Sequence, residues 1–146
     1  RQKMDQILKQ CTELGVRRIV PVICERSVSL PDSDSINGRW TELMFEACKQ
    51  SGNAFVPETC GSIRSPDAVN DSRNAAAPAS SGLWPDAGNM PRHCVFIGPE
   101  GGFTEAEEKL MRVSGFHGLH FGNWVLRVET AAVCGTAILM DRFAGR

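Results

Sequence analysis

The stretch IGPEGGFTEAEEKL, residues 97–110, constrains the fold most, because a glycine-rich turn joins two different structural signals there. Before the turn, residues 94–97 form a compact apolar run, which is typical of a central parallel strand. After the turn, Thr104 and Glu107 make the T-x-x-E pattern of a capping box and predict a helix that ends near Gly115. A strand, a tight turn and a helix in this order favour an α/β layered fold.

The N-terminal third predicts a helix, a strand and a second helix. Apolar residues follow helical spacing, and Gly15 supplies a C-terminal stop. The β-branched run at residues 19–23 predicts a strand, and Asn37 is expected to cap the second helix. The inner faces of the two helices would be Met4, Ile7, Leu8, Cys11 and Leu14, and Trp40, Leu43, Met44, Ala47 and Cys48.

The remaining segments are patterned unevenly. A short strand is expected near Phe55, and FHGLHFG predicts another. Residues 64–92 lack a clear pattern, so we expect a short helix near Asp67 followed by a mobile or weakly structured segment. The last helix, residues 130–143, is apolar on most faces, which is typical of burial on several sides or in a subunit interface.

Charge and composition limit the possible partners. A net charge of -1 over 146 residues provides no global basic field, so any grip on nucleic acid would need a local patch, a dimer groove or a further domain. No run approaches the roughly 18 apolar residues of a membrane span. The six cysteines have no C-x-x-C spacing and are expected to be buried free thiols of a reducing cytosol. His117 and His120 lack companion ligands, so no metal is expected.

The glycine turn does not match the phosphate-binding motifs. A dinucleotide fingerprint needs an acid about 20 residues further on, and the P-loop motif is absent from the chain. Glycine also lets backbone groups approach a flat ligand closely. Together with the later FGNWVL segment, the turn would form two backbone loops that bracket an adenine. A tight turn that holds no ligand explains the glycines equally well.

Four ordered motifs resemble the RsmE family of ribosomal RNA methyltransferases, within the SPOUT superfamily. They are KQCTELGVRRIVPVICERSV, FEACKQSGNAFVP, IGPEGGFTEAE and FGNWVLRVETA. The resemblance covers residues 3–56 and 95–140. Asn53 stands where the family usually has Arg, and Trp124 replaces a small or basic residue. Residues 64–92 match poorly.

The resemblance implies a SPOUT-type parallel sheet flanked by helices, with a C-terminal trefoil knot. It implies binding of S-adenosylmethionine without a metal, a homodimer, and cytoplasmic methylation of N3 of a uridine in small-subunit (16S) ribosomal RNA. Residues 1–146 would be the methyltransferase domain. The family's N-terminal PUA-like β-barrel, which adds RNA contacts, would be absent, so this chain alone is expected to bind cofactor but to methylate RNA negligibly.

The resemblance also implies roles for particular residues. Arg127 would stabilise the uridine anion, or would instead pair with Glu129 or Glu100. Glu100 would face the cofactor or base, or complement the helix that follows it. Thr130 is expected to cap the last helix. Glu46, Gln50 and Asn53 would face substrate or the partner subunit; the alternative for the first two is a solvated helix face. The cofactor-binding set is Ile97, Gly98, Pro99, Glu100, Gly101, Gly102, Phe121, Gly122, Val125, Leu126, Arg127, Thr130 and Ala131.

Two other classes of protein remain open. A non-catalytic RNA-binding or ribosome-assembly module could keep this fold, and it would bind no cofactor. A nucleotide-binding α/β enzyme unrelated to methylation is disfavoured by the missing phosphate motifs.

Overall fold

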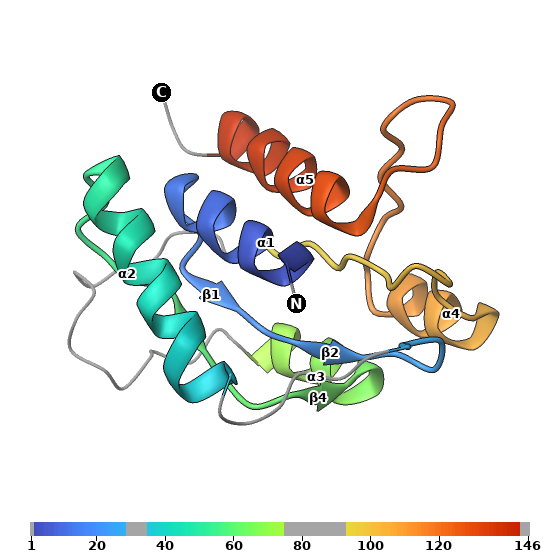
Figure 1. Cartoon of the computed structure of the whole chain (residues 1–146). Coiled ribbons are helices and arrows are strands. Elements are labelled where there is room, and N and C mark those ends of the chain that lie inside the picture. The colour runs from blue at the N-terminus through green and yellow to red at the C-terminus, as the bar shows by residue number, and fades with distance from the viewer. Residues whose placement is uncertain (1, 29–34, 75–92, 144–146) are drawn as a thin grey trace.

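The computed structural model describes residues 2–28, 35–74 and 93–143 (Figure 1). Within these ranges, short parallel strands are accompanied by five α-helices and one π-helical turn. In chain order the elements are α1 (Gln2–Glu13), β1 (Arg18–Ile19), β2 (Val22–Ile23), η1 (Ser35–Arg39), α2 (Trp40–Ser51), β3 (Glu58–Thr59), β4 (Ile63–Arg64), α3 (Ser65–Asn74), α4 (Glu105–Val113) and α5 (Val128–Phe143).

The strands form two parallel pairs, β1 with β3 and β2 with β4. The single strand predicted at residues 19–23 is divided at Pro21, because proline has no N–H to donate to a ladder. The carbonyl of Pro21 still accepts a hydrogen bond from the Ile63 N–H at 3.1 Å. The strand expected near Phe55 lies slightly later, at β3. Parallel pairing combined with helices confirms the α/β class.

The core lies where α1 and α2 pack together. In Figure 1, α1 runs between the strands and α5. The apolar faces predicted for α1 and α2 are confirmed, because Leu8, Cys11, Trp40, Met44 and Cys48 are all buried. The central cluster is Leu8, Ile36, Trp40 and Met44, with Met4, Ile19, Leu43 and Val56 packed against it.

Glycines end α1 and α4 as predicted. After α1, Gly15 has φ +85° and Val16 N–H donates to Cys11 O at 3.1 Å, which is the Schellman geometry. After α4, Gly115 has φ +90° and Phe116 N–H donates to Met111 O at 3.0 Å. Both bonds satisfy carbonyls that the helix end leaves unpaired, so local sequence is sufficient to set these boundaries.

The predicted cap of the second helix is wrong. Asn37 lies inside η1, and the residue before α2 is Arg39, which has helical backbone angles and makes no side-chain cap. Ile36 and Trp40 are both buried in the core cluster. Because both must face that core, the chain stays helical before α2 and leaves no extended residue to act as a cap.

The two strands expected between residues 93 and 122 are also wrong. Residues 94–97 and the FHGLHFG segment form no strand in the described part of the chain. Val95 and Ile97 pack instead on Gly135 of α5. An apolar run indicates that a segment is buried, but it does not indicate that its backbone pairs with a strand. The sequence pattern therefore could not distinguish a paired strand from an unpaired segment that packs on a helix.

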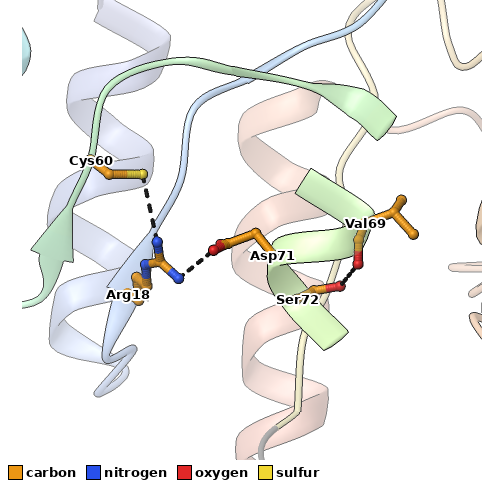
Figure 2. Close-up of polar contacts among 5 residues, drawn as sticks. All are labelled: Arg18, Cys60, Val69, Asp71 and Ser72. Atoms are coloured by element: carbon orange, nitrogen blue, oxygen red, sulfur yellow. Dashed lines mark hydrogen bonds and ion pairs between the residues drawn. The ribbon is translucent and has the colours of Figure 1, made fainter. Parts of the chain in front are cut away.

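Helix α3 confirms the short helix expected near Asp67 within the weakly patterned segment. Figure 2 shows how it is attached to β1: Arg18 Nη1 donates to Asp71 Oδ2 at 2.8 Å, and Arg18 Nη2 donates to Cys60 Sγ at 3.8 Å. Within α3, Ser72 Oγ donates to Val69 O at 2.7 Å. Residues 75–92, where a mobile segment was expected, lie outside the described residues.

All six cysteines are free thiols. Three are buried as predicted, and burial raises the pKa of Cys24 to about 11. Cys60 and Cys134 are half-buried, whereas Cys94 is exposed, so the expectation of burial is wrong for Cys94. Its position in the sequence suggested a central strand, which does not form at residues 94–97.

Candidate functional site

The glycine loop, residues 98–103, is a closed turn. Gly102 N–H donates to Pro99 O at 2.8 Å, and Gly102 has φ +69°. Such a backbone angle strains any residue that carries a Cβ. The turn therefore requires glycine at this position for backbone reasons.

Two other glycines of the loop lie where neighbouring residues leave little room for a side chain. A Cβ on Gly98 would lie 3.3 Å from Cε2 of Phe103. A Cβ on Gly101 would lie 3.0 Å from Cβ of Arg26 and 3.4 Å from its carbonyl oxygen. We expected these glycines to let a ligand approach the backbone. At these two positions the groups that approach the backbone are instead Phe103 and Arg26 of the same chain.

Arg26 holds the glycine loop from one side, and it was not among the predicted site residues. Its Nη1 donates to Gly101 O at 3.0 Å and reaches Phe103 O at 3.4 Å. The signal in the sequence was the ERSV motif, but this motif lies 75 residues before Gly101. Sequence spacing gives no information about a contact over that separation.

Glu107 connects the segments behind the loop. Its Oε2 accepts from Thr104 N–H at 2.9 Å, and Thr104 Oγ1 accepts from Glu107 N–H at 3.3 Å, so the predicted capping box is confirmed. Its Oε1 accepts from Glu25 N–H at 3.0 Å and from Ser65 Oγ at 2.7 Å. Burial alone would raise the pKa of Glu107, but the hydrogen bonds from Thr104, Ser65 and Glu25 outweigh it and hold the pKa below its usual value.

Glu107→Ala is expected to lower the free energy of unfolding by about 3 kcal/mol, because a helix cap is lost and buried donors lose their acceptor. Since the folded pKa of Glu107 is depressed, its contribution is complete above the ordinary carboxyl pKa and is lost as the pH falls through the folded value. Urea unfolding near neutral pH and at about pH 3 should show that the difference in unfolding free energy between the wild type and Glu107→Ala is smaller in acid. Glu105→Ala, at an exposed residue of the same helix turn, is the control and should lower the free energy of unfolding by less than about 1 kcal/mol. Equal losses in the two variants would contradict the role of Glu107.

Lys3 holds the glycine loop from α1. Its Nζ lies 2.6 Å from Oε1 of Glu100, in an exposed ion pair. This hydrogen bond raises the pKa of Lys3 and lowers the pKa of Glu100. Glu100 is therefore bonded to Lys3, and the pairing of Arg127 with Glu100 that we considered does not occur.

A second loop, residues 119–126, borders an open pocket of about 330 Å³. Gly122 has φ +106° in this loop, and Trp124 and Val125 are highly exposed, at 86% and 102%. The pocket brings together the predicted cofactor residues of the second loop, but residues 98–102 do not line it. Its lining is Leu119, His120, Phe121, Gly122, Asn123, Trp124, Val125, Leu126 and Ala131.

Gly135 of α5 is the point where the segments leading into both loops converge. A Cβ on this buried glycine would lie 3.4 Å from Val95 Cγ2, 3.5 Å from Phe121 Cζ and 3.8 Å from Ile97 Cδ1. Residues from the two predicted cofactor segments therefore pack on one face of the same helix. A larger side chain at this position would push them apart.

Arg127 lies directly before α5, whose first turn bonds Ala131 N–H to Arg127 O at 2.8 Å. The helix begins earlier than expected, so Thr130 lies inside its first turn and the prediction that Thr130 caps the helix is wrong. Arg127 is exposed and has no carboxylate partner among the described residues. A cation at a helix N-terminus is electrostatically unfavourable, so stability does not explain this arginine.

Glu129 is buried beside this arginine. It is 8% exposed, and its Oε2 has no hydrogen-bond partner in the described part of the protein. Its negative charge contributes to the raised pKa of Lys3, whereas the charge of Arg127 opposes that rise. A group of four charged side chains therefore interacts electrostatically where α1, the glycine loop and α5 meet. The group consists of Lys3, Arg127, Glu100 and Glu129. A buried carboxylate oxygen without a donor is rare in folded proteins.

Comparison with known proteins decides the family. The family model for an RNA methyltransferase domain matches residues 1–140. The chain belongs to this family. The resemblance to RsmE proteins is also confirmed: the ribosomal RNA small subunit methyltransferase E of Aquifex aeolicus is 34% identical over 143 residues, which is 94% of this chain and 62% of that protein.

Two solved structures with bound S-adenosylmethionine are similar in fold to this chain. A methyltransferase from Legionella pneumophila in complex with S-adenosylmethionine is 31% identical, with a TM-score of 0.78 over 96% of this chain and 61% of that chain. A ribosomal RNA small subunit methyltransferase E from Neisseria gonorrhoeae, bound to S-adenosylmethionine, is 31% identical, with a TM-score of 0.75 over 98% of this chain and 62% of that chain. The chain thus spans about three fifths of the length of these relatives.

Three residues predicted to face substrate or a partner lie apart from the two loops of this RNA methyltransferase domain. Glu46 is exposed on α2 and pairs with Lys49 at 2.6 Å, and Gln50 is exposed one turn later. Asn53 Nδ2 donates to Thr12 O at 3.1 Å, and its Oδ1 accepts from the Phe55 N–H at 3.0 Å. Within this chain Asn53 therefore connects the end of α1 to the segment after α2.

No group of three or more histidine, cysteine, aspartate or glutamate side chains suited to a metal ion occurs within residues 2–28, 35–74 and 93–143. In these same ranges, no helix has the length and apolar character needed to cross a membrane.

Proposed function

We propose that this chain is the methyltransferase domain of an S-adenosylmethionine-dependent enzyme that methylates N3 of a uridine in small-subunit ribosomal RNA. The observation that carries the proposal is the family match over residues 1–140, together with the relatives named ribosomal RNA small subunit methyltransferase E. A ribosomal substrate implies a cytoplasmic enzyme. Solved relatives with bound S-adenosylmethionine support the cofactor.

The pocket of the second loop, residues 119–126, fits part of an adenosylmethionine-type ligand. The pocket of about 330 Å³ lies within the size range of small-molecule sites. It is lined by a glycine-containing loop, which suits recognition of a nucleoside through backbone groups. The Oε2 of Glu129, which has no partner among the described residues, can accept a hydrogen bond from a ligand. The proposed contacts are Ile97, Gly98, Pro99, Glu100, Gly101, Gly102, Phe121, Gly122, Val125, Leu126, Arg127, Thr130 and Ala131.

Arg127 is the favoured catalytic group. Uridine N3 carries a proton at neutral pH and becomes a nucleophile only when that proton passes to water. The bound cofactor would supply an activated methyl group, and S-adenosylhomocysteine would be the product that leaves. The protein's task is then to position the base and stabilise its developing negative charge. Arg127 carries an exposed positive charge without a carboxylate partner in the described part of the chain. Glu100 is less suited to accept the proton, because Lys3 holds its pKa below the usual value.

Calorimetry with S-adenosylhomocysteine and transfer of a tritiated methyl group to small ribosomal subunits that lack the modification test this function. We expect the complete protein to bind the ligand and to label the ribosomal RNA at a uridine. Binding without transfer to any RNA would overturn the assigned reaction. Absence of binding would favour a non-catalytic RNA-binding or assembly module.

We further propose that the chain forms a SPOUT-type trefoil knot at its C-terminal end. The convergence of Val95, Ile97 and Phe121 on Gly135 supports this topology, because the two loops must lie close together for the chain to pass between them. The packing of α5 against α1 would then keep the knotted segment in place (Figure 1).

We also propose a homodimer through α5. This helix is apolar on most faces, and one chain does not cover all of them. Ile138 and Phe143 remain 44% and 45% exposed in the single chain. Ile138→Asp is expected to weaken the dimer about thirtyfold, or about 2 kcal/mol, because a charge would be buried without a partner. Sedimentation at micromolar concentration measures this. Val113→Asp on α4, at a residue 73% exposed, should leave the dimer intact; a monomeric wild type would contradict the proposal.

A further inference from the structure

Arg26 presents an anchored guanidinium beside the glycine loop. The side chain is exposed, yet Nη1 is held by the carbonyls of Gly101 at 3.0 Å and Phe103 at 3.4 Å. An arginine has five N–H donors, so this anchor uses only part of its hydrogen-bonding capacity. The remaining donors are held at a defined position next to the proposed cofactor loop.

The charge of Arg26 is not neutralised within the described residues. Ion pairs neutralise five other basic residues among those described, whereas Arg26 bonds to neutral carbonyls and has no carboxylate partner in the part of the chain that the structure describes. The paired residues are Lys3 with Glu100, Arg18 with Asp71, Arg39 with Asp5, Lys49 with Glu46, and Arg112 with Glu108.

The turn that carries Arg26 is also held in place. Cys24 N–H donates to Ser27 Oγ at 3.0 Å, and Ser27 N–H donates to Cys24 O at 3.1 Å. Glu25 N–H donates to the buried Glu107 at 3.0 Å, which ties the turn to the start of α4. A cation fixed by its own backbone and by the loop loses little freedom on binding an anion, which separates it from an ordinary surface arginine.

We infer that Arg26 binds a backbone phosphate of the RNA substrate and so positions the target nucleotide over the glycine loop. The inference rests on the proposed function and deepens it. Guanidinium groups match phosphate oxygens in a forked geometry, and phosphate contacts fix the register of a nucleic acid without reading its sequence. Arg26 lies at the surface, where a polyanion can reach it, and so acts as a positioning residue for RNA.

The test compares Arg26→Gln and Arg26→Lys in the complete protein. Binding to small ribosomal subunits lacking the modification is measured at several salt concentrations with fixed magnesium, alongside calorimetry with S-adenosylhomocysteine. Arg26→Gln is expected to weaken RNA binding about fivefold near 0.1 M salt and to reduce the slope of log K against log salt by about 0.7 to 0.9, the share of one phosphate. Arg26→Lys keeps the charge and should retain the slope.

Arg112→Gln is the matched control, because Arg112 is exposed on α4 and its weak pair with Glu108 spans 3.8 Å; it should not change the slope. An unchanged slope in Arg26→Gln would overturn the inference and leave Arg26 only as an anchor of the loop. The inference would also be overturned if Arg26→Gln and Arg26→Lys both lose S-adenosylhomocysteine binding while the salt dependence of RNA binding is retained. If the wild type binds no S-adenosylhomocysteine, the proposed function fails, whatever the slopes show.

Discussion

Arg127→Ala is expected to lower methyl-transfer turnover by about 10²- to 10³-fold, while the affinity for cofactor changes less than about threefold. The reason is electrostatic. A positive charge aimed at the base is needed only when the uridine N3 proton has left, so its loss raises the barrier more than it weakens ground-state binding. Because Arg127 is exposed and precedes α5, its removal leaves no buried group unpaired. Its cation is unfavourable at the helix N-terminus but favourable near the buried carboxylate of Glu129, so the two effects oppose each other and stability should change little.

Single-turnover methyl transfer and calorimetry with S-adenosylhomocysteine, on the complete protein, measure the two quantities separately. Arg127→Lys should recover part of the turnover, because it restores the charge but not the planar fork. Arg112→Ala on the exposed face of α4 serves as the charge-matched control and should have no effect on turnover. A parallel fall of turnover and cofactor affinity would indicate that Arg127 only shapes the loop, and the catalytic assignment would be wrong.

Gly101→Val is expected to weaken S-adenosylhomocysteine binding about a hundredfold, which corresponds to about 3 kcal/mol. A Cβ at this position would lie 3.0 Å from Cβ of Arg26, which is tighter than nearly all such contacts in folded proteins, and a branched side chain adds further atoms. The glycine loop must then move away from Arg26 and lose the bonds to Gly101 O and Phe103 O. The proposed ligand contacts on the loop would move with it.

Gly61→Val is the matched control, because Gly61 is exposed and a Cβ there would meet nothing within 4 Å. Its cofactor affinity should equal that of the wild type. Thermal unfolding of both variants shows whether Gly101→Val remains folded at the assay temperature. Unchanged affinity in a folded Gly101→Val protein would mean that the glycine loop does not contact the cofactor.

Local sequence determined the helices of this protein and several of their boundaries. The apolar spacing of α1 and α2 identified the faces that are buried, and Gly15 and Gly115 ended their helices with the expected backbone geometry. The Thr104 and Glu107 capping box formed as predicted. These features depend on residues within about one turn of each other, so their physical causes are contained in a short stretch of sequence. The ordered motifs also identified the family.

Only the tertiary structure decided which distant groups meet. Val95 and Ile97 lie on α5 and form no strand in the described chain, because an apolar run requires burial but does not choose its partner. Glu107 is more than a cap, since Glu25 and Ser65 reach it from elsewhere in the chain. Glu100 pairs with Lys3 and not with Arg127, the partner that we had considered. Arg26 contacts the glycine loop, although the ERSV motif that contains it gave no sign of this contact. The hydrogen bonds and the ion pair among these contacts join residues 42 to 97 positions apart. Their geometry follows from the packing of whole elements, and sequence spacing alone does not encode it.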